Sequence, residues 1–355
     1  MSEQTTLPAG ASHGSTCLPF VIVDSYNVEL KHHDGFLGDR ANQGAFRERL
    51  EKWRKVLRKT GEDPLGSKTS EEIAKKELDK ALTDGDPETA GVVHAAVEEF
   101  AQELAAVIKR FLSLKAWRDT ERIVVGGGLR ASRVGEVAIG RASVILKADK
   151  LNIELTPIRN HPDEAGLIGA VHLAPRWMFA GHDAILAADI GGSNIRAGLV
   201  ELALKKAPDL SKASVRKSER WRHADEKRVS RSDAVAKLTD MFQKLIAVAQ
   251  KEKLRLAPFI GIGCPGLIAA DGRIERGGEN LPGNWEGKNF NLPRVLVENI
   301  PKIQQDDTLV VMHNDAVVQG LSERPAMDDV KRWGALTIGT GLGNARFTNR
   351  RDDET

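Results

Sequence analysis

DIGGSN, residues 189–194, is the stretch of sequence that decides the fold. It lies between two apolar runs, 184–189 and 195–201, whose composition is typical of β-strands. The pattern predicts a hairpin in which the first strand ends on an acid and two glycines let the turn approach a ligand closely. Such a turn can present backbone N–H groups to a phosphate while the carboxylate holds Mg²⁺ through water. An ordinary hairpin with an acidic edge would explain the same residues. The candidate ligand-binding residues are Asp189, Gly191, Gly192, Ser193 and Asn194.

Two further glycine-rich turns follow predicted strands, one after the apolar run 335–338 and one after 122–125. Glycines in these places suit a phosphate cradle, although turns are rich in glycine for many other reasons. The candidate residues are Gly339, Thr340 and Gly341 in the first turn and Gly126, Gly127 and Gly128 in the second.

The tri-glycine turn fits a dinucleotide-binding fingerprint only loosely. Ala131 stands where the third glycine belongs, and the next predicted strand, 151–156, ends without the acid that would bind a ribose. The three glycines can instead let the adenosine of a nucleotide lie against the backbone, or they can form a plain strand-to-helix turn.

A polar pair, Asn314-Asp315, follows the apolar run 309–312. A carboxylate at the carboxyl end of a strand stands where α/β sheets bind their ligands. It can act there as a general base for a hydroxyl group. Asn and Asp are also common helix N-caps, which would explain the pair without any catalytic role.

Composition excludes several classes of protein. The 355 residues are 41% hydrophobic and 29% charged, with a net charge of +2, which is ordinary for a globular protein and does not favour nucleic acid binding. Cys17 and Cys264 are too few and too far apart for a zinc cluster, and they indicate a reducing compartment. Residues 1–18 lack the features of a secretion signal, and no apolar run reaches the ~18 residues of a membrane span. We expect a cytoplasmic protein that binds neither nucleic acid nor membrane.

Strands alternate with helices along the chain, which predicts an α/β fold. The longest predicted helix, 87–114, carries apolar residues at spacings of three and four, and a second amphipathic helix is predicted over 232–251.

Taken together, the motifs resemble the ROK (repressor, open reading frame, kinase) family of sugar kinases and, more distantly, the bacterial glucokinases. Two further segments look like the family's adenosine-binding segment and closing helix: IVVGGGLRAS (123–132) and AGLIGAVHLA (165–174). The motifs that carry the resemblance are DIGGSNIRAGLVE (189–201), GIGCPGLI (261–268), ENLPGNW (279–285), HNDAVVQG (313–320) and LTIGTGLG (336–343).

The order of these motifs differs from that of the family. Segments of the family's closing half occupy residues 18–174, and segments of its opening half occupy 184–343. Joining residue 355 to the start of the chain restores the family order, so we hypothesise a circular permutation. In the restored order, Glu29 and His32 stand near the family's Glu-x-Gly-His sugar loop, with Lys31 in place of its glycine. A charged surface loop is the alternative interpretation of these residues.

The resemblance implies a two-lobed actin/hexokinase-like fold, with two α/β lobes of ribonuclease-H-like topology, here circularly permuted. The expected division is a disordered lead at 1–17, a larger lobe from 18–165 and 306–355, a crossing helix and linker at 166–183, and a smaller lobe at 184–305.

The resemblance also implies an activity, the transfer of the γ-phosphoryl group of ATP to a hexose hydroxyl with Mg²⁺ as cofactor. Asp315 would accept the hydroxyl proton, and Asp189 would orient Mg²⁺ through water. The three glycine turns would hold the nucleotide and its phosphates. No zinc is expected, because the family's cysteine-rich loop is absent. The implied sugar-binding residues are Asn280, Asn314, Asp315, Glu29 and His32.

Other functions stay open at this stage. The chain can be a non-catalytic sugar- or nucleotide-binding regulator, or a repressor, although residues 1–20 hold no helix-turn-helix. It can also be a swapped dimer in which each half completes another chain, and homodimers are common in the family. The identity of the sugar does not follow from the sequence.

Overall fold

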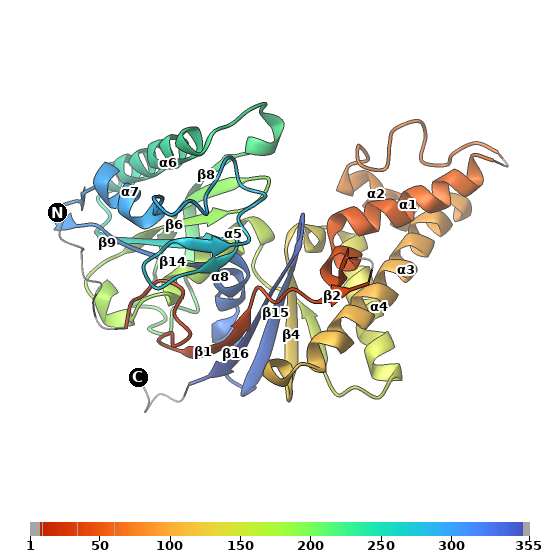
Figure 1. Cartoon of the computed structure of the whole chain (residues 1–355), viewed down its shortest axis with the longest axis horizontal. Helices are drawn as coiled ribbons and strands as arrows, with labels where there is room; N and C mark the ends of the chain where they lie inside the picture. The colour runs from red at the N-terminus through yellow and green to blue at the C-terminus, as the bar shows by residue number, and fades with distance from the viewer. Residues whose placement is uncertain (1–7, 9, 34, 60, 351–355) are drawn as a thin grey trace. The chain divides into compact units, whose positions relative to one another are not determined.

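The computed structural model describes residues 8, 10–33, 35–59 and 61–350 (Figure 1). The chain divides into two compact units. Unit 1 consists of residues 1–27, 163–331 and 345–355, and unit 2 consists of residues 28–162 and 332–344.

The two units divide the chain differently from the predicted lobes. Residues 306–331, expected in the same lobe as 18–165, belong to unit 1. The physical reason is strand pairing, because β14 (Leu309–Asn314) lies parallel to β9 (Leu256–Cys264) along its whole length. The polar pair at 314–315 is therefore in the same unit as DIGGSN.

The sheet of unit 1 has five strands in the order β14-β9-β6-β7-β8. β6, β9 and β14 are parallel, and β7 is antiparallel to both of its neighbours. Numbered along the chain, the order is 5-4-1-2-3 with only the second strand reversed, which is the topology of a ribonuclease-H-like unit. The predicted α/β class and the predicted hairpin are confirmed. The bounds of the remaining strands are β6 Ala184–Ile190, β7 Ile195–Glu201 and β8 Ser214–Trp221.

Helices cover this sheet, and β6 is buried along its whole length, as a central strand should be. Helix α6 (Arg231–Lys251) contacts β7, and α8 (Asp315–Leu321) contacts β9. A capping box starts α6, in which Ser230 and Asp233 bond each other's backbone N–H groups. The helix predicted over 232–251 is therefore confirmed to within one residue.

Short elements complete this part of the chain. They are α5 (Pro162–Gly169), α7 (Leu292–Asn299), the pair β10 (Leu267–Ile268) and β11 (Ile274–Arg276), and the pair β12 (Lys302–Ile303) and β13 (Asp306–Asp307).

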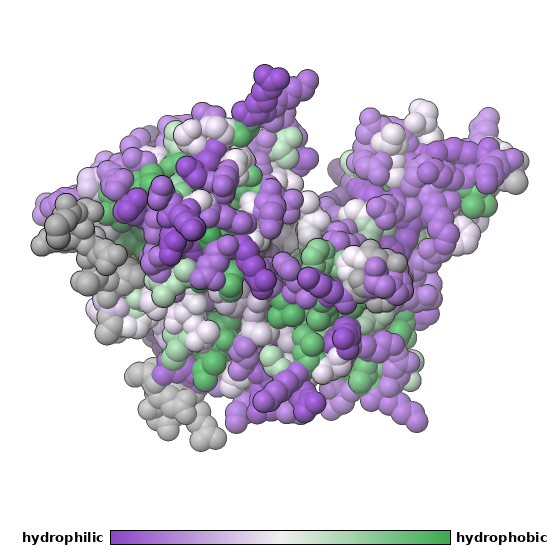
Figure 2. Space-filling model, viewed as in Figure 1, coloured by the Kyte–Doolittle hydropathy of each residue, from purple (hydrophilic) through white to green (hydrophobic). Residues whose placement is uncertain are grey.

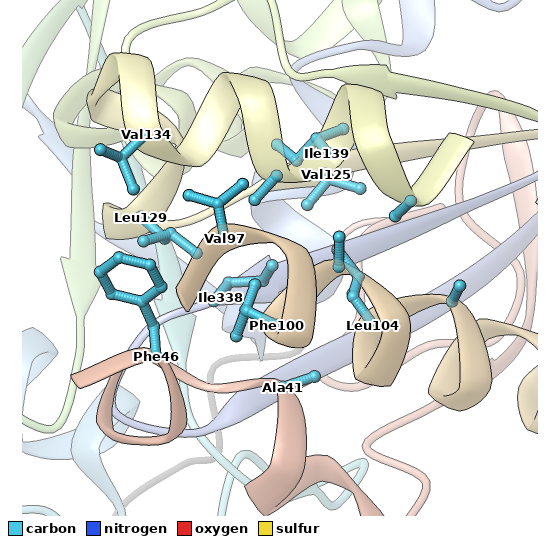
Figure 3. Packing of buried hydrophobic residues seen from close by; sticks show 14 of the residues in the cluster. Ala41, Phe46, Val97, Phe100, Leu104, Val125, Leu129, Val134, Ile139 and Ile338 are labelled. Atoms are coloured by element: carbon cyan, nitrogen blue, oxygen red, sulfur yellow. The ribbon is translucent and has the colours of Figure 1, made fainter. Parts of the chain in front are cut away.

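Unit 2 is built around α3 (Pro87–Leu112), the long helix that the sequence predicts. The side chain of Asp86 caps this helix by accepting hydrogen bonds from the N–H groups of Glu88 and Thr89. Figure 3 shows Phe100 and Leu104 packed among side chains of the neighbouring helices and strands. The other helices of the unit are α1 Gln43–Leu57, α2 Lys75–Asp84 and α4 Arg133–Ala148.

A second five-stranded sheet has the order β1-β16-β15-β4-β5. β15, β4 and β5 are parallel to one another, whereas β1 is antiparallel to β16. If the strands are numbered cyclically from β15, so that β1 follows β16, the order is 3-2-1-4-5, the same as in the first sheet. The bounds are β1 Val21–Tyr26, β4 Arg122–Gly126, β5 Glu154–Pro157, β15 Arg332–Ile338 and β16 Leu342–Asn349, and a small hairpin pairs β2 Lys31–His32 with β3 Gly35–Phe36.

The N-terminal segment, defined here as residues 10–18, is ordered against β14, although the sequence predicts a disordered lead over 1–17. The N–H of Gly14 donates to the carbonyl of Met312 at 3.0 Å, and the N–H of Met312 donates to Nδ1 of His13 at 3.2 Å. Ala11 and Leu18 are buried. The segment covers the outer edge of β14, an edge strand whose free backbone groups need partners.

The surface seen in Figure 2 is predominantly hydrophilic, and apolar residues lie on it in small groups. Within the described ranges, no helix has the length and apolar character needed to cross a bilayer.

Candidate active site

The candidate site of unit 1 lies where β6, β9 and β14 end. These three strands are parallel, so their carboxyl ends share one edge of the sheet. The register places Asp189 opposite Gly263, and Cys264 opposite Asn314. Asp189 and Asp315 therefore come to the same edge, which is where open α/β sheets bind ligands.

Asp189 is buried, with 4% of its surface exposed. Nη1 of Arg196, the residue opposite it in the hairpin, lies 3.6 Å from its carboxylate, and the side-chain amide of Gln319 donates to the same group. A side chain at Gly166 in α5 would place its Cβ 2.6 Å from the carboxyl carbon. Burial raises the pKa of Asp189, and Arg196 opposes that rise.

The turn after Asp189 is tight. The N–H of Gly191 donates to the carbonyl of Asn194 at 2.9 Å, and Nε2–H of His223 donates to the carbonyl of Gly191 at 2.9 Å. A Cβ at Gly192 would lie 3.0 Å from the Cβ of Asn280, so the glycine is what lets Asn280 approach. The structure thus brings the predicted sugar ligand Asn280 against the predicted phosphate turn.

Asn314 caps α8, as the non-catalytic interpretation of its sequence suggests. Its Oδ1 accepts from the N–H of Ala316 at 3.0 Å and of Val317 at 3.4 Å, and its Nδ2 donates to the carbonyl of Gly266 at 3.0 Å. These bonds fix the start of the helix, and with it the backbone of Asp315.

Asp315 begins α8 and has a strongly raised carboxyl pKa. Burial, and next the neighbouring charge of Asp189, raise the pKa of Asp315 to about 7. The same two carboxylates and burial raise the pKa of the Cys264 thiol, which is fully buried beside them. A carboxylate with a pKa near the working pH is suited to accept a proton.

The displaced pKa predicts a pH-dependent cost in stability. Asp315 holds its proton more tightly in the folded chain than in the unfolded chain, where the pKa is ordinary. Its stabilising contribution is therefore complete at low pH and is lost as pH rises toward about 7. We expect Asp315→Asn to raise the melting temperature relative to the wild type more at pH 8 than at pH 5, because the cost of holding this carboxyl is complete only above pH about 7. The exposed Asp307→Asn is the control, and an equal change at both pH values would contradict the assignment.

Sequence reasoning did not identify four residues of this site. Arg196 could have been found from the hairpin register that places it opposite Asp189, and Cys264 from its position at the end of a predicted strand. His223 and Gln319 carry no such signal, because their contacts depend on how distant segments pack.

In unit 2, the tri-glycine turn and the Gly339 turn are neighbours. Gly127 has φ +82°, and a Cβ there would lie 2.5 Å from the backbone N and O of Ile338. The N–H of Gln43 donates to the carbonyl of Gly339 at 3.0 Å. Only glycine at 127 permits this approach, so two turns far apart in sequence form one glycine-lined surface.

A small pocket of about 10 Å³ adjoins the tri-glycine turn in unit 2. The ammonium of Lys75 reaches across to the carbonyl of Gly128 at 2.5 Å. Ser132, at the start of α4, accepts from the N–H of Gly135 at 3.1 Å. The pocket is lined by Gln43, Phe46, Arg47, Lys75, Leu78, Leu129, Ser132 and Val134.

Glu29 and His32 also belong to unit 2. Glu29 is exposed between β1 and β2. The backbone of His32 lies in β2, and its side chain lies outside what the structure describes. Their place in a sugar site stays a prediction. Among the residues with described side chains, no three His, Cys, Asp or Glu gather into a metal-binding group.

Comparison with known proteins gives similarity over part of the chain. No family model matches it, and no curated protein matches it. A candidate sugar kinase from Cytophaga hutchinsonii is 21% identical, with 47% of this chain and 48% of that chain aligned and a TM-score of 0.35. A candidate N-acetylmannosamine kinase from Listeria monocytogenes is 23% identical, with 47% of each chain aligned and a TM-score of 0.33. The ROK hexokinase from Thermus thermophilus is 21% identical, with 45% of each chain aligned and a TM-score of 0.32.

The chain thus spans about half the length of the solved structures it matches. At these TM-scores the similarity alone assigns no activity to this chain. This α/β chain is similar, over about half its length, to solved structures described as sugar kinases. One of them is described as a ROK hexokinase.

Proposed function

We propose that the protein is an ATP-dependent sugar kinase that phosphorylates a hexose hydroxyl. The observation that carries the proposal is Asp315, a carboxyl group with a pKa near 7 at the carboxyl end of β14. It stands at the same sheet edge as Asp189 and the glycine turn that follows Asp189. These residues, which we propose as the proton acceptor and the anion-binding turn of a phosphoryl-transfer site, belong to one unit.

In the proposed reaction, the carboxylate of Asp315 accepts the proton of a hexose hydroxyl. The oxygen of that hydroxyl forms a bond to the γ-phosphorus as the bond from that phosphorus to the bridging oxygen of ADP breaks. The products are a hexose phosphate, ADP and a proton held on Asp315. Because the phosphoryl group is already reactive, the protein contributes mainly position and charge. The proposed sugar-binding residues are Asn280 and Asn314 in unit 1 and Glu29 and His32 in unit 2.

Mg²⁺ fits the residues around Asp189. The Oε1 atom of Gln319 is buried and has no hydrogen-bond partner among the described residues, while the amide of the same side chain donates to Asp189. The carboxylate of Asp189 and the amide oxygen of Gln319 are hard oxygen donors of the kind that hold hydrated Mg²⁺. Bound there with the nucleotide, the ion would neutralise the charge that develops on the phosphates.

The glycine-lined surface of unit 2 is the proposed nucleotide-binding part. The tri-glycine turn and the turn at 339–341 expose backbone rather than side chains, which suits the close approach of a nucleotide. Lys75 and Arg47 line the adjoining pocket and supply positive charge.

One observation favours the alternative function, a non-catalytic regulator that binds a sugar or a nucleotide. The guanidinium of Arg196 lies beside the carboxylate of Asp189 and competes with Mg²⁺ for it. A coupled assay of ADP release over a panel of hexoses separates the two functions. A kinase releases ADP with at least one hexose, and a regulator binds a ligand but releases no ADP above the sugar-free background.

We also propose that the chain is circularly permuted relative to the ROK kinases. Two observations support this. The second sheet adopts the strand order of the first only when its strands are numbered from β15 through the chain ends to β1. The C-terminal end of the described chain also lies beside the start of β1, because the N–H of Arg350 donates to the carbonyl of Phe20 at 3.1 Å. Segments of the two ends of the chain that lie close together make such a rearrangement structurally cheap.

A re-permuted protein tests this proposal. We expect a chain that joins residue 355 to residue 1 and opens between residues 182 and 183 to melt cooperatively and to bind Mg-ATP as the original does. A control opened inside β6, between residues 187 and 188, breaks the central buried strand and should not fold. Failure of the first chain to fold, under conditions in which the original folds, would contradict the permutation.

A further inference from the structure

The N-terminal segment makes three hydrogen bonds to the two residues that precede Asn314 and Asp315. Two of them involve Met312, whose N–H and carbonyl bond His13 and Gly14. The third joins the ring of His313 to the carbonyl of Ser15, with Nε2 and the oxygen 3.0 Å apart. A short piece of chain remote in sequence thus holds the end of β14.

His313 connects the N-terminal segment to the start of α8 through hydrogen bonds of its two ring nitrogens. Because the carbonyl of Ser15 can only accept, Nε2 of His313 carries the proton and Nδ1 is free to accept. The N–H of Asn314 donates to that Nδ1 at 2.7 Å. Asn314 in turn caps α8 through its Oδ1. A continuous series of hydrogen bonds therefore runs from Ser15 to the first turn of the helix that bears Asp315.

The surroundings of His313 keep it in this state. The side chain is fully buried, and the ring of Tyr26 packs edge-on against it with the ring centres 5.0 Å apart. Burial lowers the pKa of His313 to about 4, so the ring is neutral at working pH and Nδ1 stays an acceptor.

We propose that the N-terminal segment is a working part of the active site and that His313 is a positioning residue for Asp315. The segment fixes the tautomer of the buried imidazole, the imidazole fixes the backbone at Asn314, and the backbone fixes the direction of the carboxylate. The proposed effect on turnover rests on the proposed kinase function, while the effect on the Asp315 carboxyl does not.

Gly14 offers a way to displace the segment in the full-length chain. Its φ is +54°, and a Cβ there would lie 2.0 Å from the carbonyl oxygen of Ile268. Gly14→Ala must therefore move the segment away from Ile268, and we expect this movement to break the bonds of the segment to β14. Gly181 is a matched control, because its φ of +83° is also left-handed but a Cβ there meets nothing within 4 Å. Gly181→Ala carries the same backbone strain without the collision.

The experiment follows the Asp315 carboxyl by NMR titration in the wild type, Gly14→Ala and Gly181→Ala, alongside kcat and KM. In Gly14→Ala we expect the pKa of that carboxyl to fall toward its ordinary value as water reaches it, and kcat to fall about 10²-fold with little change in the KM for ATP. Gly181→Ala should match the wild type in both. If the protein is not a kinase, no variant turns over but the shift of the carboxyl pKa remains.

His313→Phe is the second variant, and it keeps an aromatic ring against Tyr26 while losing both hydrogen bonds. We expect the same shift and the same loss of kcat as in Gly14→Ala. Hydrogen exchange at the Met312 amide verifies that the segment has moved. Fast exchange there in Gly14→Ala, together with an unchanged Asp315 carboxyl and a wild-type kcat, would overturn the proposal. A lowered melting temperature without any change in these two readouts would overturn it equally.

Discussion

Asp315→Asn is expected to lower kcat for hexose phosphorylation by ~10²–10⁴-fold, because the variant has no group to accept the hydroxyl proton. The amide is nearly the same size as the protonated carboxyl, so Asn314 should still cap α8 and the fold should persist. The Kd for Mg-ATP should stay near that of the wild type, because Asp315 does not belong to the glycine turns.

Asp307→Asn is the control for this substitution, since it makes the same chemical change at a side chain that is 83% exposed. The measurement is ADP release in the presence of the best hexose, with nucleotide binding measured in parallel by calorimetry. If Asp315→Asn releases ADP at the wild-type rate, Asp315 is not the general base.

Gly127→Ala is expected to have the second large effect. The new Cβ would meet the backbone of Ile338 at 2.5 Å, and that backbone belongs to β15 and cannot shift without disturbing the sheet. Overpacking of this kind costs about 1–3 kcal/mol of stability. The collision also separates the tri-glycine turn from the turn at 339–341, so we expect Mg-ATP affinity to fall by about tenfold or more, where tenfold corresponds to about 1.4 kcal/mol.

Gly66→Ala is the matched control for this second substitution, because Gly66 also has a left-handed φ, +78°, and lies in unit 2, but a Cβ there meets nothing within 4 Å. Calorimetry with Mg-ATP and thermal melting are the measurements. Equal losses in the two variants would mean that backbone strain alone, and not the contact with Ile338, explains the effect.

The parts of the fold that depend on neighbouring residues could be predicted from the sequence. The hairpin around DIGGSN follows from two apolar runs and a glycine turn, and the structure confirms it, with Asp189 opposite Arg196. The long helix α3 follows from its apolar periodicity and from the Asp86-Pro87 start.

The parts of the fold that depend on residues distant in sequence could not be predicted. An apolar run such as 309–312 does not specify which strand it pairs with. The sequence therefore predicts it in the larger lobe, whereas its pairing with β9 places it in unit 1. The polar, glycine-rich lead looked disordered because the edge of β14 that orders residues 10–18 lies about three hundred positions further on in the sequence, as the Met312–His13 bond spans 299 residues.

The candidate site also combines features that the sequence predicts with features that depend on distant packing. The residue types of Asp189, Asp315 and the glycines are evident from sequence, but the reason for each glycine is not. Gly192 is required by the approach of Asn280 and Gly127 by the approach of Ile338, and both depend on packing. The sequence allows two interpretations of the pair Asn314-Asp315, a helix cap or a catalytic site. In the structure Asn314 caps α8, and the catalytic role of Asp315 stays a proposal.

One titration series tests whether this chain transfers the γ-phosphoryl group of ATP to a sugar with Asp315 as the base. Mg-ATP is titrated calorimetrically into the protein, and ADP is then measured after each hexose of the panel is added. We expect saturable heat at one site per chain and hexose-dependent ADP release that disappears in Asp315→Asn. Absence of heat with Mg-ATP, or ADP release that Asp315→Asn leaves unchanged, would contradict this proposal.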